Sequence, residues 1–268
     1  MNIGIIGYGS MGKMLLESFV RSENVTGGIL IANRTREKIG HLSSMATVCG
    51  SNADLASRSD IIIMCVRPVD IRTVLEDIRD EIRPDAILIS LNGSVSFGTI
   101  GKILRCKTCK VIPSLTAETG RSQTLVCHND LMNDSDKETV KTLFECMGNV
   151  TVLPEDEMGM GSELVSCMPG FIASVFDVIC DSAKKHTSIP EEQIVSMVLN
   201  TLCATGELMI DKGMTFEEVV DRVATKGGIT EEGTKVIYEK FPAISDELFE
   251  KTLEKRRLTA RKAEEAFG

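Results

Sequence analysis

Ile3-Gly4-Ile5-Ile6-Gly7-Tyr8-Gly9-Ser10-Met11-Gly12 is a short apolar run that leads directly into a G-x-G-x-x-G motif. Residues 13–19 follow with the apolar spacing of a helix. Gly7 permits a tight turn, Gly9 lets a pyrophosphate approach the backbone, and Gly12 lets the helix pack closely on the strand. The N–H groups at the start of that helix then face the phosphates. The motif therefore predicts a dinucleotide site lined by residues 7–12, including Tyr8, Ser10 and Met11; the alternative is a glycine-rich turn without a ligand.

Strands and helices alternate along the rest of the first half. Strands are expected at 28–33, 46–49, 61–66, 86–91, 110–113, 125–127 and 150–153, and helices at 36–45, 52–58, 70–82, 97–104 and 137–147. This alternation predicts an α/β domain over residues 1–154, built as a Rossmann-type doubly wound and mainly parallel sheet.

From Glu155 onward the pattern is helical only, which predicts an all-α domain over 155–268 with the boundary near Pro154. The segment 160–184 is apolar nearly all round, so it must be buried by its own chain or by a partner subunit. Further helices are expected at 188–209 and from Thr215. After a break at 227–233, two final helices follow, the last of which starts at Ser245 and ends in a charged, exposed tail.

Composition restricts the class of protein. The 268 residues carry a net charge of -9, few aromatics and no Trp. This argues against a nucleic-acid or anionic-membrane binder but allows a small anionic ligand. No targeting segment is visible, and the longest unbroken apolar runs are too short to span a bilayer. The nine cysteines have no framework spacing, so we expect reduced thiols in a cytoplasmic protein.

One cysteine pair has C-x-x-C spacing. Cys106 and Cys109, with Cys127-His128 downstream, admit a zinc site as an alternative. Adjacent residues point to opposite faces of a strand, which separates Cys127 from His128. No metal is therefore expected.

The end of the second strand indicates which dinucleotide is bound. NAD-binding proteins of this fold have an acidic residue about 20 residues beyond the glycines, where it binds the ribose 2′-hydroxyl. Here the strand ends in Asn33-Arg34-Thr35, without a carboxylate. Arg34 can pair with a 2′-phosphate and the two neighbours can donate hydrogen bonds to it, so NADP (as NADPH) is preferred. Otherwise Arg34 is a solvated loop charge.

Several runs of residues point to one family. They are residues 7–12, Asn33-Arg34-Thr35, Cys65-Val66-Arg67-Pro68, Lys110-Val111-Ile112-Pro113 and, most specifically, Val223-Ala224-Thr225-Lys226-Gly227-Gly228-Ile229-Thr230. The last run is similar to a serine-proline-glycine-glycine-threonine-threonine signature. Over nearly its whole length, the chain resembles the pyrroline-5-carboxylate reductase family.

The resemblance implies an NADPH-dependent oxidoreductase that reduces the C=N bond of a cyclic imino acid, 1-pyrroline-5-carboxylate, to proline. It implies a homodimer, or a higher oligomer, assembled through the helical domain. It places Asn52, Val66, Arg67, Pro68 and Asn92 along the cofactor groove.

The resemblance also makes the double glycine a substrate site. Gly227 and Gly228 precede a helix that contains Thr230, and their free N–H groups would form an anion site for the substrate carboxylate. Thr230 would donate to that carboxylate or to the ring nitrogen, and Thr225 stands where the family has serine. Alternatively, the glycines form only a helix-to-helix turn that Thr230 caps.

Three segments depart from the family pattern. Ser114 replaces an asparagine, Ser166-Cys167-Met168-Pro169 replaces glycine-serine-glycine-proline, and Thr215-Phe216 replaces histidine-proline. These changes alter the substrate half and leave the cofactor half largely intact. A second hypothesis is therefore a non-catalytic, NADP-binding regulatory paralogue on the same scaffold.

Overall fold

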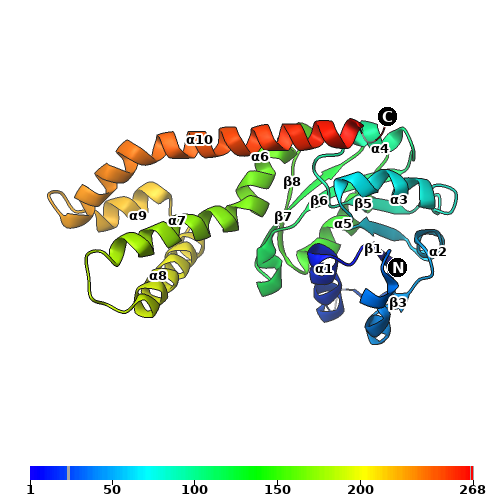
Figure 1. Ribbon diagram of the computed structural model, residues 1–268, viewed down its shortest axis with the longest axis horizontal. Helices are drawn as coiled ribbons and strands as arrows, with labels where there is room; N and C mark the ends of the chain where they lie inside the picture. Colours follow the sequence, from blue (N-terminus) through cyan, green and yellow to red (C-terminus); the bar gives the residue numbers. More distant parts are fainter. Residues whose placement is uncertain (23–24, 266, 268) are drawn as a thin grey trace. The chain divides into compact units, whose positions relative to one another are not determined.

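The computed structural model describes residues 1–22, 25–265 and 267 (Figure 1). The chain forms two compact units. The sheet unit consists of Met1–Pro169 together with Leu253–Gly268, and the helical unit consists of Gly170–Thr252. The sequence places the domain boundary near Pro154, whereas the packing groups residues 155–169 and the C-terminal segment with the sheet.

In the described part of the chain, one eight-stranded sheet has the order β3-β2-β1-β4-β5-β6-β7-β8. The strands are β1 Ile3–Ile6, β2 Ile29–Ala32, β3 Thr47–Val48, β4 Ile61–Met64, β5 Ile87–Ser90, β6 Lys107–Ile112, β7 Ser122–His128 and β8 Gly148–Val152. All neighbouring strands are parallel except β6 and β7. The predicted fold class, a mainly parallel sheet followed by helices, is confirmed.

Helices cover both faces of the sheet, because alternate strand residues point to opposite sides. Ile3 and Ile5 belong to one apolar cluster with α1 (Ser10–Arg21) and α5 (Asp134–Glu145), where Phe19 and Phe144 meet edge to face at 6.0 Å. Ile6 belongs to the other cluster, with α2 (Asn52–Arg58), α3 (Ile71–Ile78) and α4 (Phe97–Gly101).

Two local predictions in the sheet unit were wrong. The helix expected at 36–45 is a pair of 3-10 turns, η1 (Arg36–Lys38) and η2 (Gly40–Ser44). Only Ile39 and Leu42 of these turns and their junction are buried, and Gly40 disfavours a continued helix. The strand expected at 110–113 begins earlier, because β6 starts at Lys107, so Cys109 of the C-x-x-C pair lies inside it.

The expected helix at 160–184 is interrupted. Helix α6 (Met158–Ser162) is followed by a π-helical turn, η6 (Glu163–Cys167), and then by α7 (Met168–Ala183). Pro169 has no N–H to donate to the carbonyl four residues earlier, and its ring crowds that carbonyl. A wider π turn just before the proline relieves both conflicts.

The prediction of two separate C-terminal helices was also wrong. Helix α10 runs unbroken over Ile229–Glu265, with Pro242 inside it (Figure 1). The charged residues at its end, Arg261, Lys262, Glu264 and Glu265, are exposed as expected, while Ala263 and Phe267 are buried in the second apolar cluster of the sheet unit.

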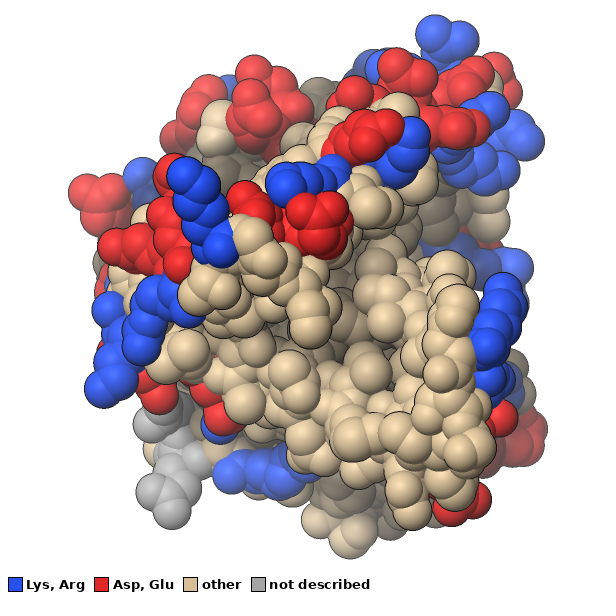
Figure 2. All heavy atoms as spheres, turned by 90° about the vertical axis from the view of Figure 1, so that its left-hand side faces the viewer, with Lys and Arg blue, Asp and Glu red and all other residues tan. Residues whose placement is uncertain are grey.

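The helical unit has almost no apolar core of its own. It contains most of α7, α8 (Glu191–Lys212), α9 (Phe216–Val223) and α10 as far as Thr252. Of its described apolar residues, only Cys180 and Ile194 are buried, while Phe216 is 80% and Ile229 95% exposed. Figure 2 shows uncharged side chains over a large part of the face seen from the side of α8 and α9. An apolar surface of this kind marks an interaction site.

Two helical stretches, Glu155–Ala183 and Glu191–Lys212, are long and apolar enough to cross a membrane by length and composition. The unbroken apolar runs in the sequence are shorter than these helices and therefore did not predict them. Length and composition do not distinguish a membrane helix from a helix that packs on a second protein.

Replacing a core aromatic tests the assignment of the sheet core. Phe144→Ala removes a fully buried ring, so it should lower the free energy of unfolding by about 3–5 kcal/mol. Leu115→Ala, at an exposed position, should change it by less than about 0.5 kcal/mol. Urea titrations followed by far-UV circular dichroism compare the two. Equal losses would contradict the core described above.

Candidate functional site

The glycine loop after β1 has a separate steric reason for each glycine. Gly7 has a φ of +101°, and a Cβ there would lie 2.7 Å from the carbonyl oxygen of Cys65. A Cβ on Gly12 would lie 2.1 Å from the Gly7 carbonyl oxygen, so the helix approaches the loop too closely for any side chain. A Cβ on Gly9 would meet nothing within 4 Å. Gly7 and Gly12 are therefore required by the fold, and Gly9 is free to accommodate a ligand.

The N-terminus of α1 is suited to hold a phosphate. Its N-cap is Gly9, which supplies no side-chain cap to the first turn, and the first intrahelical bond runs from the Lys13 N–H to the Gly9 carbonyl at 2.9 Å. The N–H groups of Ser10, Met11 and Gly12 belong to this first turn, where such groups have no intrahelical acceptor. These residues fit the pyrophosphate of a dinucleotide.

A groove of about 700 Å³ lies at the carboxyl ends of β1, β2 and β4. The strand order reverses between β1 and β4, which is where ligands bind in open α/β sheets. The groove brings together nine of the predicted cofactor residues: Gly7, Tyr8, Gly9, Asn33, Arg34, Thr35, Asn52, Val66 and Arg67. Five others do not line it: Ser10, Met11, Gly12, Pro68 and Asn92.

Asn33 links the glycine loop to the end of β2. Its Oδ1 accepts from the Tyr8 N–H at 3.0 Å, and its Nδ2 donates to the Thr35 carbonyl at 2.8 Å. Asn33 therefore fixes the glycine loop relative to the segment that follows β2. The sequence suggested only a donor to the cofactor and did not reveal this structural role.

The charged residues of the groove gather beyond the end of β2. Arg34, which is 82% exposed, lies 3.5 Å from Asp70, and Nε of Arg67 lies 2.9 Å from the same carboxylate. Arg36 donates to the Gly50 carbonyl. Sequence reasoning missed Arg36, Lys38, Asp70 and Asp77, which also line the groove. The cluster offers four cationic side chains against two carboxylates, a set that can accept a phosphate.

Burial keeps the thiols of the groove neutral. Burial raises the pKa of the Cys65 thiol above its usual range, and burial followed by the Asp54 carboxylate raises the pKa of Cys49. Both thiols remain protonated at neutral pH, so neither is a nucleophile. The Gly50 N–H, which donates to Asp54 at 3.1 Å, lowers the pKa of that carboxyl.

Two more predicted positions lie at the ends of β5 and β6. Asn92 forms a local turn, in which its Oδ1 accepts from the Ser94 N–H at 2.8 Å. Ser114, which stands where the family has asparagine, is buried, and its N–H donates to Ser122 Oγ at 3.2 Å. This bond comes from the backbone and does not depend on the side chain at position 114.

The double-glycine turn belongs to the helical unit. Gly227 has a φ of +75°, and a Cβ on Gly228 would lie 2.7 Å from Thr225 Oγ1, so the turn itself requires both glycines. The expectation of free N–H groups is wrong for this pair. Gly227 donates to a Glu231 carboxylate oxygen at 2.7 Å, and Gly228 donates to the Thr225 carbonyl at 2.8 Å. Thr230 is the exposed second residue of α10.

The cysteines of the C-x-x-C segment are separated by the sheet. Cys109 pairs with His128 across β6 and β7 and is buried in one apolar cluster, whereas Cys127 is buried in another. Within residues 1–22, 25–265 and 267, no three His, Cys, Asp or Glu side chains are grouped as metal ligands.

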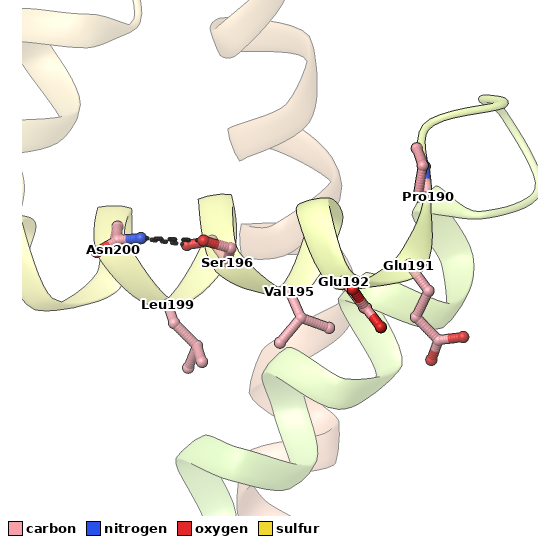
Figure 3. A pocket seen from close by; sticks show the side chains of 7 residues that line it. All are labelled: Pro190, Glu191, Glu192, Val195, Ser196, Leu199 and Asn200. Atoms are coloured by element: carbon pink, nitrogen blue, oxygen red, sulfur yellow. Dashed lines mark hydrogen bonds between the residues drawn. The ribbon is translucent and has the colours of Figure 1, made fainter.

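A larger hollow, of about 1090 Å³, lies on the helical unit. All its lining residues lie between 190 and 200, and Figure 3 shows Val195 and Leu199 pointing from the same side of α8. Lining from a single helix makes this an open part of the apolar surface. It does not resemble an enclosed ligand site.

Comparisons with known proteins assign both halves. Residues 2–93 match the family model described as NADP oxidoreductase coenzyme F420-dependent, and residues 155–258 match pyrroline-5-carboxylate reductase dimerisation. Pyrroline-5-carboxylate reductase 3 of Bacillus subtilis (strain 168) is 31% identical over 262 residues, which cover 96% of each chain. The chain belongs to the pyrroline-5-carboxylate reductase family.

Another relative and a solved structure are also similar, the latter in fold. ComE operon protein 4 of Bacillus subtilis (strain 168) is 29% identical over 94% of each chain. The crystal structure of Plasmodium falciparum pyrroline carboxylate reductase with NADP bound has a TM-score of 0.84 and 21% identity, covering 97% of this chain and 98% of that one. The family assignment makes the first half an NADP-binding domain and the second a dimerisation domain.

The different roles of Gly9 and Gly12 can be separated by experiment. Gly9→Ala should keep the melting temperature but weaken NADPH binding at least about tenfold, because its methyl group occupies the space left for the pyrophosphate. Gly12→Ala should lower the melting temperature, because its Cβ collides with the Gly7 carbonyl. Thermal unfolding and fluorescence titration with NADPH measure both. Unchanged NADPH affinity in Gly9→Ala would contradict the placement of the phosphates.

Proposed function

We propose that this protein is an NADPH-dependent reductase that transfers hydride to the C=N bond of a cyclic imino acid, with 1-pyrroline-5-carboxylate as substrate and proline as product. The observation that carries the proposal is the 31% identity to pyrroline-5-carboxylate reductase 3 over 96% of both chains. That match extends over nearly the whole length of both chains. The cofactor half and the substrate half are therefore similar together.

Bound NADPH supplies the hydride, and the chain's residues supply position. The first turn of α1 would hold the pyrophosphate, and Arg34 and Arg67 would hold the 2′-phosphate. A C=N carbon is already electrophilic when its nitrogen is protonated, so correct placement accounts for much of the rate. The proposed reaction therefore needs no acid–base pair in the site.

Thr230 and Thr225 are the proposed substrate contacts. Thr230 donates to the substrate carboxylate or to the ring nitrogen as the imine becomes an amine. A substrate carboxylate that takes the Gly227 N–H must displace Glu231 from it, since that bond is already formed at 2.7 Å. The turn therefore binds substrate by exchanging one carboxylate for another.

We further propose that two copies assemble through the helical unit. The exposed apolar residues of α7 to α10 and the match to the dimerisation model support a homodimer or a higher oligomer. Nine free thiols support a reducing, cytoplasmic location.

A non-catalytic NADP-binding paralogue is the second candidate, and the altered substrate half favours it. Thr215, where the family has histidine, caps α9, with Glu218 completing a capping box. Ser114 and Ser166-Cys167-Met168-Pro169 also depart from the family pattern of the substrate half. ComE operon protein 4, which is not named as a reductase, is 29% identical to this chain and is thus nearly as similar to it as pyrroline-5-carboxylate reductase 3.

Turnover distinguishes these candidates. NADPH oxidation followed at 340 nm with 1-pyrroline-5-carboxylate should be rapid and should yield proline. Thr230→Ala should lower kcat about 10- to 100-fold with little change in NADPH affinity, because it removes a hydrogen bond to a charged group. Thr234→Ala, one turn later, is the matched control. Tight NADPH binding without turnover would reject the reductase and support the paralogue.

Reversing the charge of Arg34 tests the choice of dinucleotide. Arg34→Glu should weaken NADPH binding about 10- to 100-fold and leave NADH binding nearly unchanged, because only NADPH carries the 2′-phosphate. Arg79→Glu makes the same charge change outside the groove and should alter neither. Fluorescence titration with both cofactors gives the dissociation constants. Equal weakening of NADPH and NADH would remove Arg34 from 2′-phosphate recognition.

A further inference from the structure

Arg256 of α10 lies against the sheet unit, with its side chain 23% exposed. Nε and Nη2 both donate to Glu163 Oε1, at 2.9 and 2.7 Å. Nη2 also donates to Ser162 Oγ at 3.0 Å and approaches Cys167 Sγ at 3.9 Å. This guanidinium is fixed by contacts to α6 and to the π turn.

The partner of Arg256 is deeply buried. Glu163 is 1% exposed, and its Oε2 is buried without a hydrogen-bond partner among the described residues. A buried carboxylate is costly unless it is paired, so Glu163 needs Arg256 as its partner. The two hydrogen bonds to Oε1 hold the guanidinium in one orientation. Glu163 begins the π turn, and such turns occur frequently at functional sites.

The guanidinium reaches the carboxyl ends of β5 and β6. A Cβ on Gly93, just after β5, would lie 3.8 Å from Arg256 Nη1 and 3.0 Å from Cδ1 of Ile112, the last residue of β6. A Cβ on Gly159 would lie 3.5 Å from Arg256 Cδ. Arg256 therefore lies within van der Waals range of both glycine positions, at the sheet edge where open α/β folds bind ligands.

Nη1 is the one nitrogen of Arg256 for which the described residues supply no acceptor. Because Nε and Nη2 bind the carboxylate, the planar fork leaves the two Nη1 hydrogens directed away from Glu163. Lysine at this position could pair with Glu163 but would lack a second, separately directed donor.

We propose that Arg256 is a ligand-binding residue, with Nη1 donating to an oxygen acceptor of the reacting pair, and that Glu163 positions it. Two oxygens have this chemistry: the carboxamide oxygen of the nicotinamide and the carboxylate of the imino acid. The proposal rests on the proposed reductase function and adds a residue to it.

Arg256→Lys tests this directly because it keeps the charge beside Glu163 and removes Nη1. The melting temperature should stay close to that of the wild type. Either the NADPH dissociation constant or the KM for 1-pyrroline-5-carboxylate should rise about tenfold. A rise in the first identifies the carboxamide, and a rise in the second alone identifies the carboxylate. Arg257→Lys, on the exposed side of the same turn, is the matched control.

A double variant guards against a loss of stability. Glu163→Gln with Arg256→Met removes both charges, so no unpaired buried charge remains, and it should show the same binding defect. Wild-type NADPH affinity and KM in both variants would overturn the proposal while leaving the reductase function intact. If the wild-type protein binds NADPH but does not turn over, weaker binding of NADPH or of 1-pyrroline-5-carboxylate to Arg256→Lys, measured by titration, still supports Arg256, and unchanged binding of both rejects it.

Discussion

The Glu163–Arg256 ion pair joins two segments that are 93 residues apart in the chain. Between them the chain leaves the sheet unit at Pro169, forms the helical unit, and returns at Leu253. The helical unit is therefore an insertion, tied at both ends to the same body. Removing one member of a buried ion pair is costly, because the other charge is then left buried and unpaired. Ser162 supplies one of the additional bonds.

The glycines show how one motif combines structural and ligand-binding demands. Gly7 and Gly12 touch backbone and allow no Cβ, whereas Gly9 faces open space. At the second turn neither glycine is left to accommodate a ligand. The positive φ of Gly227 explains that glycine, and close contact with Thr225 explains Gly228. Evidence for a ligand is therefore stronger at the first turn than at the second. At the second turn, a ligand site is supported by the family assignment.

Periodic signals predicted the fold well. Buried parallel strands appear as short apolar runs and α3 as a clear amphipathic repeat, because each depends on local pattern. The groove was largely predictable because its residues follow strand ends. The role of Arg256 was not predictable, because it lies in the charged run Lys255-Arg256-Arg257. No local pattern distinguishes its half-buried guanidinium from the solvated charges beside it. The unbroken course of α10 through Pro242 was missed for a related reason, since local propensity opposed it.

The edges of the sheet bear on how copies of this chain can meet. An open edge strand is a template for pairing with another chain, and proteins blunt it by shortening it or placing polar residues there. Strand β3 has two residues, which is too short to extend a sheet. Strand β8 carries Asn149 and Thr151 and starts at Gly148, where φ is +135°. The sheet is thus poorly suited to strand-by-strand growth, and this leaves the helices as the route to a defined assembly.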